Sequence, residues 1–312
     1  MGNTKVPSFP VDEPALSQMN KLTVKDIKSL FKTGIVYSNL FAVFTGFWLA
    51  LYFTNTPFME TIDLFILTML GSTFVLIGAS VLNNWYDADI DPIMKRTRKR
   101  PTVTGKLSLQ TVFLIGVIST ILGLTVLLFT TLTATLVALV GWFSYVVLYT
   151  IWAKRRFTLN TEIGCISGAV PPVIGWAAVS TDILHIVPIV LFLIMFIWQT
   201  PHFLSLAMKK CREYKAAGIP MLPVVHGFGF TKRQIVVYIT CLLPLPFFLG
   251  ELGITYLIIA TILNIGWLIL GFSGFFMKND LKWAKMIFIY SLNYLVIMFL
   301  SMVIVAIQSP IS

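Results

Sequence analysis

Nine apolar stretches, most of them about twenty residues long, dominate this 312-residue sequence. A helix needs roughly 20 mostly apolar residues to cross the hydrocarbon core of a bilayer. Only 12% of the residues are charged, whereas a soluble domain is about 25% charged. So few charges cannot cover the surface of a soluble protein of this length. The sequence therefore predicts an all-α, multi-pass membrane protein whose solvent is the lipid bilayer.

The predicted spans are separated by polar breaks or by breaks marked with proline and glycine, which are typical of loops. The nine spans are expected at residues 33–53, 61–83, 109–129, 132–151, 160–179, 183–206, 235–249, 252–276 and 286–307. Residues 1–32 carry five lysines and no apolar core of signal-peptide length. We expect them to form a cytosolic tail, followed by a single transmembrane domain over residues 33–312.

The distribution of basic residues predicts the orientation of the chain. If the N-terminus is cytoplasmic, the segments on the outer side are 55–60, 130–131, 180–182, 250–251 and 308–312, and none of them contains a Lys or Arg. Cytoplasmic loops are enriched in these residues, and adding or losing one span would destroy the bias. We therefore expect a cell-membrane protein with its N-terminus inside and its C-terminus outside. The formal charge of +10 then reflects topology, and no nucleic-acid partner is expected.

The three cysteines do not indicate a metal or disulfide framework. Cys165, Cys211 and Cys241 show no CxxC spacing, so they are interpreted as small apolar residues.

The most informative polar segment follows the second span. Asn83, Asp87 and Asp91 are spaced four residues apart, so on a continuous helix they would form one stripe of oxygen ligands. Mg²⁺ typically takes one or two carboxylates and completes its shell with phosphate oxygens and water. Acids inside or beside membrane spans are costly and tend to be functional. The stripe therefore predicts a magnesium site.

A basic cluster follows the acidic stripe immediately. Lys95, Arg96 and Arg100 belong to it, and Lys154 and Arg155 recur in the loop after the fourth span. Arginine and lysine side chains suit phosphate oxygens, so these five residues are candidates to hold a diphosphate. Basic loop residues also act as topology anchors, and for the first cluster alone that interpretation is the stronger one.

Two further segments suggest a pocket. Pro171 and Pro172 interrupt the fifth span, and broken helices at membrane depth usually line a cavity. Near the inner end of the sixth span, Gln199 and His202 share one helix face. A lone histidine is more often structural than ligating, so this second signal is weaker.

With these segments identified, the chain resembles the UbiA superfamily of intramembrane prenyltransferases, and within it the branch that farnesylates heme. The resemblance is carried by the Asn83–Asp91 segment with its tail through Gly105; by residues 154–156 with Pro171-Pro172-x-x-Gly175-Trp176; and by Trp198-Gln199-x-Pro201-His202-Phe203 followed by Glu213-Tyr214 and residues 218–223. It covers nearly the whole membrane portion.

The resemblance implies nine helices around a central cavity with a polar cap facing the cytoplasm. It implies that farnesyl diphosphate binds with Mg²⁺ at Asn83, Asp87 and Asp91, and that Lys32 joins the diphosphate ligands. The acceptor would be protoheme IX, with Gln199, His202, Glu213 and Tyr214 as contacts. The product would be heme O, taken up by a downstream heme A synthase.

The chain departs from the superfamily pattern in several places. Asn84 stands where many members have Asp, Glu213 stands where relatives often have Asp, and Thr33 follows Lys32 where a Lys-Pro pair is common. The second acidic motif of quinone prenyltransferases is largely absent, and Gln199 and His202 occupy that region. Two alternatives stay open, namely a quinone or aromatic-acid prenyltransferase and, from another class, a transporter for an organic anion or Mg²⁺.

Overall fold

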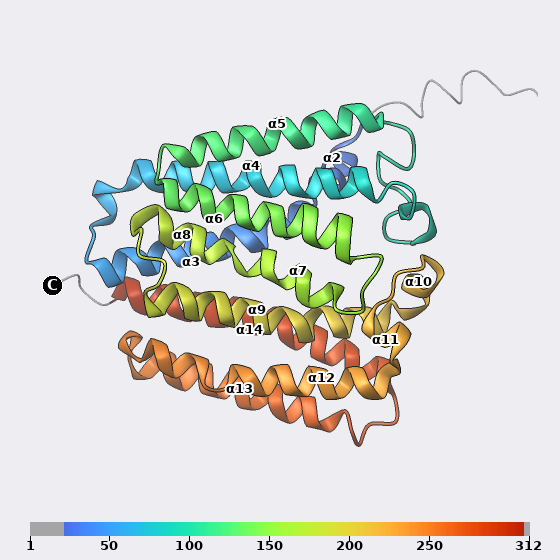
Figure 1. The fold of residues 1–312 in the computed structure, drawn as a ribbon. Coiled ribbons are helices and arrows are strands. Elements are labelled where there is room, and N and C mark those ends of the chain that lie inside the picture. Colours follow the sequence, from blue (N-terminus) through green and yellow to red (C-terminus); the bar gives the residue numbers. More distant parts are fainter. Residues whose placement is uncertain (1–21, 309–312) are drawn as a thin grey trace, which may run out of the picture.

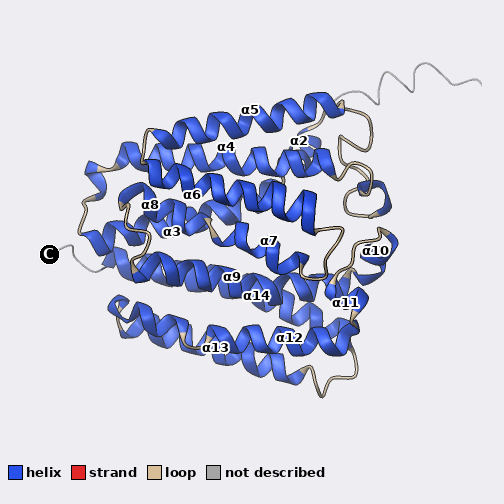
Figure 2. Ribbon diagram, viewed as in Figure 1, coloured by secondary structure: helices blue, strands red, loops and turns tan. Residues whose placement is uncertain are grey.

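The computed structural model describes residues 22–308, and in this part of the chain every regular element is a helix (Figure 2). Nine helical segments of this region are long and apolar enough to cross a membrane. The prediction of an all-α, multi-pass membrane protein is thus confirmed. The helices are α2 (Val24–Phe31), α3 (Thr33–Thr54), η1 (Phe58–Glu60), α4 (Ile62–Tyr86), η2 (Asp91–Ile93), α5 (Leu109–Leu128), α6 (Leu132–Phe143), η3 (Ser144–Ala153), α7 (Asn160–Ala169), α8 (Pro171–Val179), α9 (Ile186–Lys209), α10 (Cys211–Ala216), α11 (Leu222–Val225), α12 (Gly227–Leu242), η4 (Leu245–Leu252), α13 (Ile254–Ser273) and α14 (Asp280–Gln308).

The long helices lie side by side, and each runs from one end of the molecule to the other, across the view of Figure 1. The short helices α2, α10 and α11 and the loop between η2 and α5 all lie at the same end, on the right of the view. The loops that contain no Lys or Arg lie at the opposite end. The charge asymmetry predicted from the sequence is therefore present in the structure as two chemically different ends.

The spans differ from their predicted bounds mainly at prolines and at helix ends. The seventh span is longer than predicted, because α12 begins at Gly227 instead of residue 235 and η4 continues to Leu252 beyond the break at Pro244. Proline lacks the backbone N–H that a continuous helix requires at this point. The ninth span starts at Asp280, six residues before its predicted position, and Lys232 forms an ion pair with this acid.

Close helix contacts form where glycine replaces a larger side chain. A Cβ added at Gly46 of α3 would lie 1.8 Å from the Pro172 carbonyl oxygen, and one at Gly175 of α8 would lie 1.9 Å from the Val43 carbonyl oxygen. Small residues of this kind let helix backbones approach closely in membranes. The break at the proline pair separates α7 from α8, so α8 can lie against α3 while α7 follows another course.

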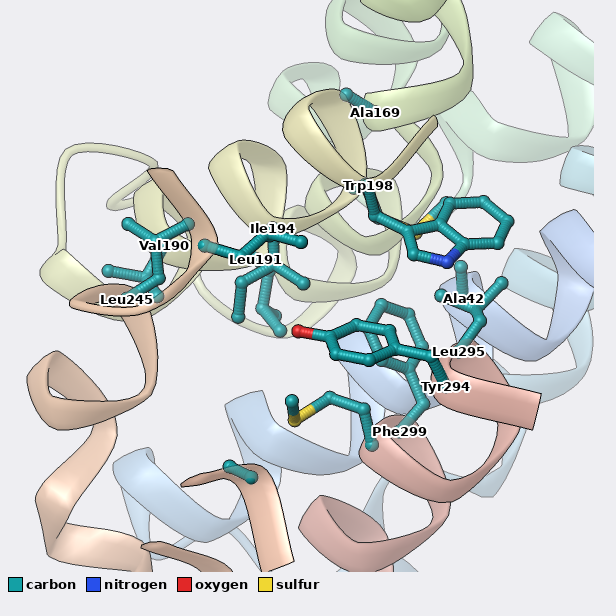
Figure 3. Close-up of a cluster of buried hydrophobic side chains, with 14 of the residues drawn as sticks. Ala42, Ala169, Val190, Leu191, Ile194, Trp198, Leu245, Tyr294, Leu295 and Phe299 are labelled. Carbon is teal, nitrogen blue, oxygen red and sulfur yellow. The ribbon is translucent and has the colours of Figure 1, made fainter. Parts of the chain in front are cut away.

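The largest apolar core joins α3, α9, α12, α13 and α14. Figure 3 shows Trp198 of α9 close to Leu295 of α14 and Ala42 of α3. Van der Waals packing of this kind, rather than exclusion of water, holds helices together in lipid. This packing fixes one wall of the cavity described next.

Candidate active site

A cavity of about 320 Å³ lies among α3, α4, α6, η3, α7, α8, α9 and α14. This volume is in the range of small-molecule sites. One part of its lining is polar and comes from the basic end of the bundle, through the residues Lys32, Asn83, Asp87, Asp91, Arg96, Arg100 and Lys154. The rest is mostly apolar and follows α4, α6 and the break between α7 and α8 toward the middle of the bundle. The cavity therefore has a charged head and an apolar body.

Asn83, Asp87 and Asp91 all line the charged head, but they do not lie on one continuous helix. The prediction of a single helical stripe is wrong, because α4 ends at Tyr86 and Asp87 is its C-cap. Asp91 instead begins the short helix η2, directly before Pro92. Two hydrogen bonds keep the three residues on one side of the chain, from the Asp87 N–H to the Asn83 carbonyl at 3.0 Å and from the Asp91 N–H to the Asp87 carbonyl at 2.9 Å.

Both carboxylates have cationic partners. Lys154 forms an ion pair with Asp87, and Arg100 forms one with Asp91 at 2.6 Å. Asp87 and Asp91 are only 1% and 3% exposed, so these charges are almost fully removed from solvent. Buried charges of this kind require a partner of opposite sign. The head of the cavity is thus a network of alternating charges that a charged ligand can rearrange.

Asn83 is held by two side chains from other elements. Lys32, at the junction of α2 and α3, donates a hydrogen bond to the Asn83 Oδ1, and the Asn83 Nδ2 donates to the Thr150 Oγ1 at 2.9 Å. The backbone of Lys32 has a positive φ of 50°, which ends α2 and directs the chain into α3. Burial lowers the pKa of Lys32 well below its ordinary value, with nearby Arg100 acting in the same sense.

The six predicted diphosphate ligands fall into two groups. Lys32, Arg96, Arg100 and Lys154 line the cavity. Lys95 is exposed and lies outside the lining. Arg155 also lies outside it, because its guanidinium binds the Asp89 carboxylate with two contacts of 2.7 Å and stacks on the Tyr86 ring.

The donor set fits a magnesium ion that shares its shell with a substrate. The Asp87 Oδ1 is buried and accepts no hydrogen bond, and the Arg155 Nη2 lies 3.8 Å from it, so the lone pairs of this oxygen remain open to a ligand. Within residues 22–308, no cluster of three or more His, Cys, Asp and Glu could enclose a metal on its own. Mg²⁺ is typically bound by one or two carboxylates together with substrate phosphates, and this arrangement needs no closed protein cage.

One wall of the head comes from residues that the sequence did not single out as ligands. Tyr145 and Tyr149 line the cavity, and the Thr150 hydroxyl donates to the Tyr145 carbonyl at 2.8 Å. All three lie on η3, where the helix widens to i→i+5 hydrogen bonding. Such π-helical segments are rare and frequent at functional sites. No sequence signal marks this widening, because it depends on how the helix packs.

The predicted acceptor contacts are also divided. Gln199, His202 and Tyr214 line the cavity, whereas Glu213 does not and instead forms an ion pair with Lys210 at 2.8 Å. Gln199 fits because its neighbour on α7 is a glycine, since a Cβ at Gly168 would lie 2.1 Å from the Gln199 Oε1. Burial raises the pKa of Tyr214, which keeps its phenol neutral.

The chain belongs to the UbiA prenyltransferase family, whose sequence pattern matches residues 39–293. Among its relatives is the protoheme IX farnesyltransferase of Oceanobacillus iheyensis, which is 58% identical over 298 residues, or 95% of each chain.

Two solved structures share the fold. The apo structure of a UbiA homolog from Aeropyrum pernix superimposes with a TM-score of 0.69 at 20% identity and covers 87% of this chain and 98% of its own. A UbiA homolog from Archaeoglobus fulgidus bound to GPP and Mg²⁺ gives a TM-score of 0.62 at 14% identity, with 89% and 99% covered.

Proposed function

We propose that this protein transfers the farnesyl group of farnesyl diphosphate to a vinyl group of protoheme IX, giving heme O. The observation that carries this proposal is the cavity, in which a buried carboxylate oxygen that accepts no hydrogen bond and four cations share a polar head next to an apolar body. Near-full-length similarity to protoheme IX farnesyltransferases, at 58% identity for one relative, supports the acceptor.

The charged head suits the diphosphate. Asn83, Asp87 and Asp91 are the proposed ligands of Mg²⁺, which when bound neutralises the diphosphate and makes it a better leaving group. The known binding of GPP and Mg²⁺ by the Archaeoglobus homolog supports this choice of cofactor. Lys32, Arg96, Arg100 and Lys154 then hold the oxygens on which negative charge builds as the carbon–oxygen bond breaks.

The apolar body suits the isoprenoid chain. Val75, Leu76 and Ala79 line it from α4, and Ile174 lines it from α8. An apolar wall excludes water from the allylic carbon, which would otherwise be hydrolysed. Tyr145 and Trp142 lie in the same lining, and the faces of aromatic rings stabilise positive charge. As the allylic carbon–oxygen bond and the vinyl π bond break, the farnesyl carbon joins one vinyl carbon and the oxygen of a water molecule joins the other. The proton that this water loses passes to the departing diphosphate.

The part of the lining that contains Gln199 and His202 favours heme over a quinone as the acceptor. It presents these two residues, from the region in which quinone prenyltransferases carry a second acidic motif, together with Tyr214. A transporter is disfavoured because the charged side chains gather at one end of the cavity instead of near the middle of the spans.

The placement of the protein follows from its charge asymmetry. The basic end, with the charged head, would face the cytoplasm in the cell membrane, with the N-terminus inside and the C-terminus outside. Residues 33–312 would form one catalytic domain, and α2 and Lys32, from the end of the expected cytosolic tail over residues 1–32, pack against it. A downstream heme A synthase would take the product.

The test compares single substitutions at neighbouring acids. Asp87→Ala and Asp91→Ala should each reduce farnesylated heme by about 100-fold or more in membranes, a loss typical of removing a group that stabilises developing charge. Asp89→Ala is the matched control, since Asp89 is in the same segment but 62% exposed in its side chain and outside the cavity lining. Heme would be extracted and its mass measured, where the product gains a farnesyl group and a hydroxyl group. Normal turnover in both variants at unchanged protein levels would overturn the metal-site assignment.

A further inference from the structure

The wall of the cavity formed by α9 and α14 contains an imidazole in an unusual setting. The His202 ring stacks on two aromatic rings, with ring centroids 5.0 Å from that of Trp198 and 4.7 Å from that of Phe288, and meets the Phe203 ring edge-on at 5.2 Å. These three ring contacts hold the plane of the imidazole. His202 also lines the cavity.

Ser291 of α14 forms a hydrogen bond with one of the two ring nitrogens. Its Oγ lies 2.7 Å from the His202 Nδ1 and 2.7 Å from the Phe288 carbonyl oxygen. A hydroxyl has one proton, so with that proton donated to the carbonyl the oxygen accepts from the Nδ1–H. In this arrangement the neutral ring has its proton on Nδ1 and a lone pair on Nε2.

The backbone of the same serine also binds Trp198, one of the rings that stack on His202. The Trp198 indole N–H donates to the Ser291 backbone carbonyl at 2.8 Å, and Ser291 is fully buried. Residue 291 therefore ties both Trp198 and His202 of α9 to α14. Within residues 22–308 the His202 Nε2 has no hydrogen-bond partner, so it is the free polar atom that this side chain offers to the cavity.

We propose that the His202 Nε2 is the axial ligand of the porphyrin iron in the acceptor, with Ser291 as the positioning residue that sets its tautomer. This inference rests on the proposed function and adds to it the mode of acceptor binding. Metal-ligating histidines commonly donate their other ring N–H to a fixed acceptor, which orients the ring and strengthens the ligand. The bond formed is a coordinate bond from the nitrogen lone pair to iron and needs no co-reactant.

A cation lies near the same aromatic group, just outside the cavity lining. Lys209 is seven residues after His202 on α9, which places it two turns, or about 10 Å, farther toward the basic end. Its ammonium lies 4.3 Å from the centroid of the Phe288 ring that stacks on His202. Lys209 forms no ion pair with an acid in the described part of the chain. An iron porphyrin bearing carboxylates would match both the imidazole and this unpaired charge.

Heme binding can be followed separately from catalysis. The purified full-length protein would be titrated with ferric protoheme in detergent, and optical and electron paramagnetic resonance spectra recorded. We expect a spectrum of histidine-ligated heme in the wild type and in the control His226→Ala, since His226 is exposed and outside the cavity lining. His202→Ala should lose that spectrum and regain it when imidazole is added. A wild type without histidine ligation, or a His202→Ala protein with the wild-type spectrum, would overturn the inference.

A second variant keeps the test decisive if His202→Ala does not fold. Ser291→Ala leaves the imidazole in place but removes the acceptor of its Nδ1–H. Losing such a partner typically costs about 10–100-fold in metal affinity, so heme affinity should fall by that amount while the histidine-ligated spectrum persists at saturation. Lys209→Gln should weaken heme binding about tenfold without altering the spectrum.

The two proposals fail differently. If the wild type makes no farnesylated heme, the proposed function is wrong. If it makes this product while neither the His202 nor the Ser291 substitution affects heme ligation or affinity, only the axial-ligand inference is wrong.

Discussion

Asp91 shows how a single residue of the charged head is tuned. Its burial raises the pKa of the carboxyl above its ordinary value, and Arg100 opposes this shift through its charge and a hydrogen bond. Under the proposed function, binding of magnesium and diphosphate requires the ionised form of Asp91. Removing the positive charge at residue 100 should therefore raise this pKa further, so that activity is lost at a higher pH as the solution is acidified.

The variant Arg100→Gln tests this directly through the pH profile of kcat/KM. We expect its acid limb to move to higher pH, in addition to a loss of rate at every pH from the missing diphosphate contact. Arg98→Gln is the control, since Arg98 is exposed and lies outside the cavity lining. An acid limb of Arg100→Gln that coincides with that of the wild type would show that Arg100 does not control Asp91.

The sequence predicted which residues line the cavity where regular spacing constrains the direction of the side chains. It failed in the loop after α4, where the backbone is irregular. Four-residue spacing placed Asn83, Asp87 and Asp91 in one cavity even though α4 ends between them. Beyond the helix end, periodicity no longer applies, so the sequence could not distinguish Arg96, which lines the cavity, from Lys95, which does not. The roles of these residues in binding remain predictions.

At the scale of elements, the crossing of α3 and α8 should be sensitive to a single methyl group. The Cβ of Gly46→Ala would lie 1.8 Å from the Pro172 carbonyl oxygen, a backbone atom that can move only with its helix. Overpacking of this kind costs about 1–3 kcal/mol. Thermal unfolding in one detergent should show this loss of stability as a lower melting temperature. The same change should also disturb the cavity, because α8 and the α7–α8 break line it.

Gly34→Ala in the same helix provides the control. A Cβ at Gly34 meets nothing within 4 Å, and alanine favours helix over glycine by up to about 1 kcal/mol. We therefore expect unchanged or slightly higher stability. Equal melting temperatures for Gly34→Ala and Gly46→Ala would mean that the α3–α8 contact adjusts freely and does not define the cavity.

Helix α2 is an element that the sequence did not predict, since residues 24–31 were expected within the tail. Thr23 and Asp26 form its capping box, Lys106 binds Asp26 at 2.7 Å, and the Asn84 side chain donates to the Leu30 carbonyl at 2.7 Å. The hydrogen bonds from Lys106 and Thr23 lower the pKa of Asp26 to about 2, so the cap stays ionised at physiological pH.

These contacts give Asn84 a structural reason to differ from the superfamily Asp. An aspartate at this position would lack the side-chain N–H that binds the Leu30 carbonyl at the end of α2. The turn that follows α2 brings Lys32 to Asn83, so its position depends on the same contact. Neither α2 nor the π-helical turn at η3 could be predicted from periodicity, because both depend on contacts with α4, which is distant in the sequence.

At the scale of the whole molecule, the distribution of charge is the feature that sequence predicted best. Hydropathy marked nine spans, and alternation of the loops then placed the basic residues at one end, as the structure shows (Figure 1). Both arguments depend only on the thickness and charge of the membrane, which are independent of the detailed packing. The position and shape of the cavity depend on side-chain packing and could not be obtained in this way.

The same asymmetry makes a prediction about orientation that reporter fusions can test. Reporters that are active only outside the cell should work when joined after Thr56 or Ser180, which lie in loops at the end without Lys or Arg. Reporters that fluoresce only inside should work after Lys99 or Lys278, at the basic end. Since each span reverses the chain, the reporters after Thr56 and Ser180 must lie on one side of the membrane and those after Lys99 and Lys278 on the other. The reverse pattern would place the charged head, and with it Asp87, on the side away from the cytoplasm, and farnesyl diphosphate would then have to reach the cavity from outside the cell.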